Sequence, residues 1–368
     1  MKFKSLLLTL CVLILFILGL CMVFNTTAAE VLDRSLAKST HHALVRQILY
    51  AILGSLLAMG VWFLGYDQFL RLSGHFLVIG SVLLVLVFIP GIGQQINGAH
   101  RWLGVGSYSF QPSEFVKYLI PLYYIHAITT RREPLLLKDF LVLLAKMAIP
   151  MGLILIEPDN GTVAIILSSL LVLFLLTKVR WVYWGLPLLV LSVVGGIVAF
   201  QMPHVHNRIQ VYLHPELDLQ GKGHQPYQAK IAAGSGGVWG RGLGESLQKL
   251  DYLPHARSDY IAAIFAEEFG FMGIMLLILL YMMIGYLGFS IAVQIQDLQA
   301  FYVVAILTFL ICFQAFLNLG VASGLLPSKG INLPFFSQGG TSLLANFMVI
   351  CIILNIAKGR IEVQRRTG

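Results

Sequence analysis

Two clusters of charged residues could carry chemistry, and each lies beside a long apolar run. The first contains Glu114 and Lys117, just after Gln111-Pro112-Ser113. A spacing of three residues places both side chains on one face of a helix. Lys117 could therefore pair locally with Glu114, or face a bundle interior and meet a second acid. Asp159, in the helix-breaking stretch Glu157-Pro158-Asp159-Asn160-Gly161, is a candidate for that acid.

The second cluster ends a long polar segment and runs from Asp251 to Asp259. Asp259 stands at the start of an apolar run. A carboxylate there can have a purely structural role, as a charge favoured by the helix dipole. Glu267 and Glu268 follow within the first turns of that run. A charge at membrane depth costs on the order of a few kcal/mol and needs a partner or water. We therefore expect a polar cavity beneath Asp259.

Other polar features point less clearly to a site. The glycines between Gly234 and Gly244 could close backbone amides on phosphate oxygens, but no Gly-Lys-Ser/Thr follows, which excludes a nucleotide P-loop. His204 and His206 have no third ligand nearby. The four cysteines all lie in apolar runs, without metal-ligand spacing. We expect no resident metal site and no disulfides.

A further stretch, residues 327–340, is interrupted by prolines and glycines that a regular helix does not tolerate. Irregular backbone near a membrane is accepted only where it is buried in protein or lines a wet cavity. We therefore expect the functional site where irregular segments gather at the outer face. Four such segments are expected, around Trp102, Asp159, Asp259 and Ser337.

The elements that position these residues must be membrane spans. Hydrophobic residues make up 58% of the 368 residues and charged residues 11%, whereas a soluble domain carries roughly 25% charge. A spanning helix needs about 20 mostly apolar residues. We predict an all-α polytopic membrane protein with ten spans, near residues 6–26, 44–65, 73–90, 112–128, 139–157, 160–177, 180–201, 260–287, 299–321 and 341–358.

The distribution of basic residues predicts the orientation of the spans. The net charge of +8 would suggest nucleic acid in a soluble protein, but here Lys and Arg cluster in short connections, so no nucleic-acid partner is expected. One set of connections is rich in Lys and Arg and the other is poor, which places both termini in the cytoplasm. The exception is a long external loop, residues 202–259, within a single domain of residues 1–368.

Six motifs follow one another along the chain: Asn97–Trp102, Gln111–Lys117, Glu157–Thr162, Leu253–Asp259, Ala266–Gly270 and Leu333–Gly340. Together, and in this order, they resemble the SEDS family (shape, elongation, division, sporulation; FtsW/RodA/SpoVE). The stretch from Gly242 to Pro254 looks closer to the cell-division (FtsW) branch than to the elongation (RodA) branch.

The resemblance implies a peptidoglycan glycosyltransferase of the bacterial inner membrane. Such proteins polymerise lipid II, and extend glycan linked to undecaprenyl pyrophosphate, at the outer face of that membrane. The expected partners are a class B penicillin-binding protein, which acts as transpeptidase, and other divisome proteins. No cofactor is implied by the resemblance. A divalent cation (Mg²⁺ or Mn²⁺) could help to hold the pyrophosphate.

The resemblance also assigns roles to individual residues. The family's essential acid falls on Asp259 and its supporting acid on Asp251, while its buried ion pair falls on Lys117 with Asp159. Two further positions match the family's pattern: Trp102 and Glu114.

The chemistry requires a group that deprotonates a sugar hydroxyl and groups that neutralise a pyrophosphate. We predict Asp259 as the general base and Arg257 or Arg208 as phosphate clamps. Where the family commonly has Pro-Glu-Ala-His-Thr-Asp, this chain has Pro254-His255-Ala256-Arg257-Ser258-Asp259, so the local field is more positive. The expected substrate-binding residues are Trp102, Arg101, Arg208, Arg241, Arg257 and Ser337.

Two other classes of protein fit the same residues. In a lipid II flippase, Lys117 and Asp159 could serve alternating access. A non-catalytic scaffold for a transpeptidase would leave Asp259 without a role. The polar residues concentrate at the outer rim and do not follow a path across the membrane, which favours the enzyme. An elongation role in place of a division role also stays open.

Overall fold

The computed structural model describes residues 1–34, 40–96, 99–105, 108–200, 212–218, 221, 223–249, 257–328 and 330–367. Regular structure in these ranges is almost entirely helical. The helices are α1 (Lys2–Arg34), α2 (His42–Leu64), α3 (Tyr66–Arg71), α4 (Ser73–Leu86), α5 (Ser113–Thr129), α6 (Leu137–Ile156), α7 (Asn160–Leu176), α8 (Trp181–Phe200), the 3-10 helix η1 (Pro215–Asp218), α10 (His224–Ser235), α11 (Ile261–Ala292), α12 (Leu298–Ala322) and α13 (Gly340–Thr367).

Each of the ten apolar runs in the sequence is occupied by one of these helices. Within the described residues, six helices are long and apolar enough to cross a membrane: α1, α2, α6, α11, α12 and α13. Shorter apolar helices occur in α4, α7 and α8. The remaining run is α5, which carries the charged pair Glu114 and Lys117 and is buried along most of its length.

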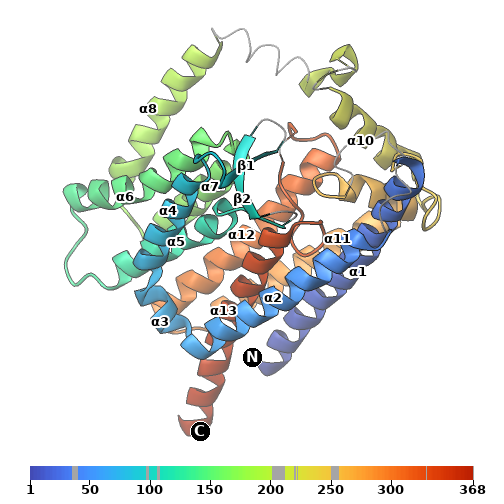
Figure 1. Ribbon diagram of the computed structural model, residues 1–368. Coiled ribbons are helices and arrows are strands. Elements are labelled where there is room, and N and C mark those ends of the chain that lie inside the picture. The colour runs from blue at the N-terminus through green and yellow to red at the C-terminus, as the bar shows by residue number, and fades with distance from the viewer. Residues whose placement is uncertain are drawn as a thin grey trace.

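The spans pack into a bundle in which distant parts of the sequence meet. α13 lies along α2, α11 lies along α12, and α1 lies along α11. Of the six long spans, α12 and α13 are the most buried. The two chain ends lie at one end of the bundle, and the small sheet lies toward the other (Figure 1). The connection between α12 and α13 joins the two most buried of these spans.

Three short strands form a small antiparallel sheet, which the sequence does not predict. Its strands are β1 (Gly93–Ile96), β2 (Ala99–Val105) and β3 (Tyr108–Phe110), paired in that order. Trp102 lies in β2 opposite Gln94. The expectation of irregular backbone around Trp102 is therefore wrong. Strand pairing satisfies backbone groups that a loop near a membrane would leave without partners.

α11 is divided in two by a non-helical residue. At Gly270 the backbone has φ 65° and ψ −162°, a conformation open to glycine because it has no Cβ. The part after the break, Phe271–Ala292, measures about 33 Å at 1.5 Å per residue and is by itself long enough to cross a bilayer core. Glu267 and Glu268 lie just before this break.

Candidate active site

The connection between α12 and α13 holds the segment that carries Asp259. The hydroxyl of Ser337 donates to the carbonyl of Ser258 at 2.6 Å, and the amide of Gln338 donates to the carbonyl of Arg257 at 2.9 Å. The side chain of Asn318, on α12, donates to the carbonyl of Asp259 at 2.8 Å. The backbone of residues 257 and 258 is thus held by the α12–α13 connection, and that of Asp259 by α12.

Asp259 itself is half-buried in this arrangement. Its Oδ2 faces the backbone of Gly330, because a Cβ built on Gly330 would lie 3.3 Å from that oxygen. The next residue, Tyr260, is buried and shares a 2.7 Å hydrogen bond with Ser328. Asp259 is thus a carboxylate residue that is held at its backbone and only partly buried, as a group that exchanges protons with an arriving molecule must be.

Ser337 has a structural role at this centre. Besides its bond to Ser258, its Oγ accepts the amide of Leu333 at 2.8 Å, and its carbonyl accepts the side chain of Gln47, on α2, at 3.3 Å. The residue is 5% exposed. Its hydroxyl therefore fixes the backbone around Asp259, and this is the contact that the structure shows for a residue predicted to bind substrate.

Lys117 is buried in the bundle and pairs with Glu114, its neighbour one helical turn earlier. Its Nζ also donates to Oε1 of Gln314 at 2.8 Å, and the amide of Gln314 donates to the carbonyl of Asn332 at 2.8 Å. Lys117 is therefore linked through one α12 side chain to the connection that holds Asp259.

Asp159 is not the partner of Lys117. Its carboxylate caps the N-terminus of α7, accepting the amide of Thr162 at 3.1 Å and the Thr162 hydroxyl at 2.8 Å. It also accepts the side chain of Gln111 at 3.3 Å. Among the ion pairs of the described residues, none joins Lys117 to Asp159, which corrects the pairing expected from the sequence. A helix cap satisfies this carboxylate through local bonds that need no cation.

Arg101 holds the small sheet to the connection between α6 and α7. Its Nε donates to the carbonyl of Glu157 at 2.8 Å and its Nη2 to the carbonyl of Pro158 at 2.6 Å. The Glu157 side chain is fully buried, and neither of its oxygens has a hydrogen-bond partner among the described residues. Glu157 lies just beyond α6, and burial raises the pKa of its carboxyl to about 8. The nearby Asp159 adds to this rise in pKa, and Arg101 opposes it. Burial therefore favours the neutral form of the Glu157 carboxyl.

Replacing Arg101 by Met should lower the stability of the protein by about 1–3 kcal/mol, because two charge-assisted hydrogen bonds to carbonyls are lost at a partly exposed site. Thermal unfolding of the purified protein in detergent measures this. Arg132→Met, at an exposed position, is the matched control and should leave the melting temperature unchanged. An Arg101→Met protein that melts with the wild type would show that the sheet is held by other contacts.

Of the remaining predicted residues, two lie in the described part of the chain and two do not. Trp102 is half-buried in β2, and Arg241 lies against Glu267, with Nη1 3.6 Å from Oε1. Asp251 and Arg208 lie outside the described residues. In the described part of the chain, no group of three His, Cys, Asp or Glu side chains could hold a metal ion.

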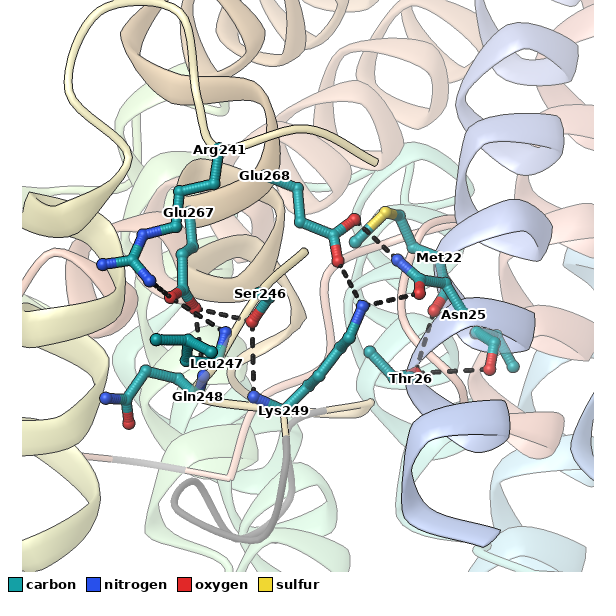
Figure 2. A network of polar contacts seen from close by, with 11 residues as sticks. Met22, Asn25, Thr26, Arg241, Ser246, Leu247, Gln248, Lys249, Glu267 and Glu268 are labelled. Carbon is teal, nitrogen blue, oxygen red and sulfur yellow. Dashed lines mark hydrogen bonds and ion pairs between the residues drawn. The ribbon is translucent and has the colours of Figure 1, made fainter. Parts of the chain in front are cut away.

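Two site residues were missed in the sequence, Gln314 and Asn318. They are four residues apart in an otherwise apolar run, so they lie on one face of α12. Amides at that spacing inside a membrane span are a signal, because each needs a partner there. Glu267 and Glu268 were expected to line a polar cavity beneath Asp259. They are instead bonded to the loop before residue 250 and to α1 (Figure 2).

Comparison with known proteins identifies the family. The family model described as "Cell cycle protein", which covers FtsW, RodA and SpoVE, matches residues 5–361. The chain belongs to this family. The resemblance to the SEDS family predicted from the sequence is thereby confirmed, and the chain is a multi-pass membrane protein of that family.

Relatives match over nearly their full length. A protein of Trichlorobacter lovleyi named "Probable peptidoglycan glycosyltransferase FtsW" is 33% identical over 361 residues, which is 96% of this chain and 93% of the relative. Stage V sporulation protein E of Bacillus subtilis is 35% identical over 357 residues, which is 96% of this chain and 97% of the relative. The relative named FtsW and the relative named for sporulation are thus about equally similar to this chain.

Solved structures confirm the mainly helical polytopic fold. A chain described under "Structural coordination of polymerization and crosslinking by a peptidoglycan synthase complex" superposes with a TM-score of 0.76 at 26% identity, covering 96% of this chain and 97% of that one. The crystal structure of Thermus thermophilus RodA superposes with a TM-score of 0.68 at 24% identity, covering 96% of each chain, and shows the fold alone.

Proposed function

We propose that this SEDS protein is a peptidoglycan glycosyltransferase that polymerises lipid II into glycan strands, with Asp259 as the general base. The observation that carries the proposal is the half-buried residue Asp259, held at its backbone by Asn318 of α12. The names of the relatives support the reaction class.

In the proposed reaction a sugar hydroxyl of one lipid-linked molecule attacks the anomeric carbon of another. The Asp259 carboxylate accepts the hydroxyl proton, the new glycosidic C–O bond forms, and the bond to the pyrophosphate breaks, so the lipid pyrophosphate leaves with the electron pair. Arg257, two residues from Asp259, is the nearest basic residue along the chain for the leaving group, whose developing charge a cation stabilises. Arg208 is the second residue proposed to hold the pyrophosphate.

The proposed site faces outward, away from the cytoplasm. The support is the excess of Lys and Arg on the side of the two termini, together with the position of both chain ends at the end of the bundle away from the sheet (Figure 1). The outer face is where a lipid-linked sugar can be polymerised outside the cell.

The proposed partner is a class B penicillin-binding protein. Its support is the structural relative described with a peptidoglycan synthase complex, in which polymerization and crosslinking are coordinated. A polymerase of this kind would need a second protein to crosslink its product. Cell division is the proposed process, supported by several relatives named FtsW.

The test is polymer formation by the purified full-length protein with its class B partner in detergent or liposomes. Labelled lipid II should be converted to long glycan strands that a gel resolves. The same liposomes report the competing function, since a flippase would move labelled lipid II to the opposite leaflet and make no polymer. Translocation without polymer would overturn the proposal in favour of transport, and neither activity would favour a scaffold.

A further inference from the structure

The glycine-rich part of the long loop is held as a fixed surface on α11. We call residues 236–249 the glycine segment. Where Gly270 interrupts α11, the amide of Met272 donates to the carbonyl of Val238 at 3.2 Å. A Cβ built on Gly240 would overlap a carbonyl oxygen of α11, so the two backbones are in direct contact. The side chains of the glycine segment are therefore presented in fixed directions.

The polar side chains of the glycine segment turn into the protein. The hydroxyl of Ser246 donates to the buried carboxylate of Glu267 at 2.6 Å. Lys249 forms a buried ion pair with Glu268 at 2.8 Å, and Figure 2 shows these side chains converging. A loop surrounded by water usually has the opposite arrangement, with its charged side chains outside.

The apolar side chains of the same segment face out of the protein. Trp239 is 79% exposed and Leu243 is 67% exposed, and Val238 and Leu247 are also exposed. Single exposed apolar residues are common on soluble surfaces. Here four of them cover a buried polar interior within one short segment, which inverts the soluble pattern. An apolar environment outside the protein would remove this surface from water, which is favourable.

This apolar surface continues the exposed face of α11. Five exposed apolar side chains of that helix recur at intervals of three or four residues, which places them on one helical face. They are Met272, Leu276, Leu279, Met283 and Tyr286. Because α11 is long and apolar enough to cross a membrane, lipid is the environment expected along this face. The face leads up to Met272, which is bonded to Val238 of the glycine segment.

Two polar contacts between α1 and α11 are separated by the thickness of a membrane. In one, Lys4 of α1 donates to Ser290 of α11. In the other, Asn25 of α1 donates to Glu268 of α11 at 2.6 Å. From Lys4 to Asn25 a helix rises about 32 Å at 1.5 Å per residue, and a bilayer core is about 30 Å thick. The glycine segment, bonded to Glu268, is therefore expected at the level of a membrane boundary.

We propose that the glycine segment is a membrane-contacting element, whose Trp239 and Leu243 side chains insert into the lipid bilayer at its interface. Tryptophan suits this depth because its ring is apolar while its indole N–H can bond to headgroups or water. The exposed charged residues of the segment, Arg241 and Glu245, suit the headgroup region. The occupant of this surface is lipid, and the inference does not depend on the reaction proposed for Asp259.

A surface reserved for a protein partner makes a different prediction. Without the partner, its apolar side chains would stand in water or be covered by a second copy of the chain. Contact with lipid needs no partner, because α11 and the glycine segment already place the side chains. The environment of Trp239 in a bilayer therefore distinguishes the two.

The test is the quenching of Trp239 fluorescence in the full-length protein, reconstituted in liposomes of phosphatidylcholine and phosphatidylglycerol. The chain has five tryptophans, so the signal of Trp239 is the wild-type emission minus that of Trp239→Phe. Phosphatidylcholine brominated near the headgroup end of its acyl chains should lower this signal by about twofold or more. Bromine near the methyl end should lower it less, because the indole lies at the interface. Iodide in the water should also lower it less.

Trp184→Phe is the matched control. Trp184 is 9% exposed, and its indole donates to the carbonyl of Val179 at 3.3 Å, so the protein shields it. The signal obtained by the same subtraction should be lowered less than that of Trp239 by the brominated lipid, and hardly by iodide. Thermal unfolding of both variants confirms that they are folded.

Stronger quenching of Trp239 by iodide than by brominated lipid would overturn the inference, because the side chain would then face water. Quenching by neither would also overturn it, since the surface would be covered by protein. The measurement is repeated with the class B partner present. Loss of lipid quenching on its addition would identify a protein interface and overturn lipid as the occupant, whereas unchanged quenching would support it.

Discussion

Asp259→Asn should lower the rate of lipid II polymerisation by about 10²–10⁴-fold, the range that a general base contributes, while the protein stays folded. Asparagine has nearly the same shape as aspartate but cannot accept the proton of the attacking hydroxyl. The backbone of residue 259 is held by Asn318, and this bond does not depend on the carboxylate. The loss should therefore appear in kcat and not in the melting temperature or the yield of folded protein.

The matched control is Glu216→Gln, which changes a carboxylate at an exposed position of the same long loop. It should polymerise at the wild-type rate. Asp259→Glu, which restores a carboxylate with one more methylene, should recover part of the activity. Polymer at the wild-type rate from Asp259→Asn would remove Asp259 as the base and direct attention to another group at the outer rim.

Lys117→Met should destabilise the protein by about 3–5 kcal/mol, because Glu114 would then be a buried charge without a partner. Glu114 is 8% exposed and Lys117 2%. The double variant Glu114→Gln/Lys117→Met should recover most of that loss, since neither charge remains. Unfolding of the protein in detergent, by heat or denaturant, measures both variants.

The same experiment distinguishes the two acids that the sequence offers to Lys117. If Asp159 were its partner, Asp159→Asn would rescue Lys117→Met and Glu114→Gln would not. We expect the reverse, because Asp159 caps α7 and its loss removes a helix cap. Arg131→Met, which breaks an exposed ion pair, should change the free energy of unfolding by no more than about 1 kcal/mol.

The spans could be read from the sequence because each depends on its own residues. A run of about 20 apolar residues must become a helix in a bilayer, since every backbone group has to be satisfied within the segment. Helices accordingly occupy all ten predicted runs. The sheet formed by β1, β2 and β3 and the break at Gly270 are different, because each is stabilised by hydrogen bonds to another segment.

The features of the site divide in the same way, into those that the sequence predicted and those that packing decided. The types and order of the residues predicted that the stretches around Asp159, Asp259 and Ser337 would be irregular and carry the polar groups. Their partners were not predictable from spacing. Glu114 is the neighbour of Lys117 on one helix, which spacing allows, but Gln314 reaches Lys117 only because α12 packs against α5.

The sequence alone therefore determined the class of protein, its spans, its family and the acid proposed as the base, because these depend on local composition and on motifs. The tertiary structure decided which side chains meet. It gave Asp159 to the cap of α7, Lys117 to Glu114 and Gln314, and Glu268 to Lys249 and Asn25. A buried charge accepts whichever partner helix packing brings within hydrogen-bond distance, and packing is a property of the whole bundle.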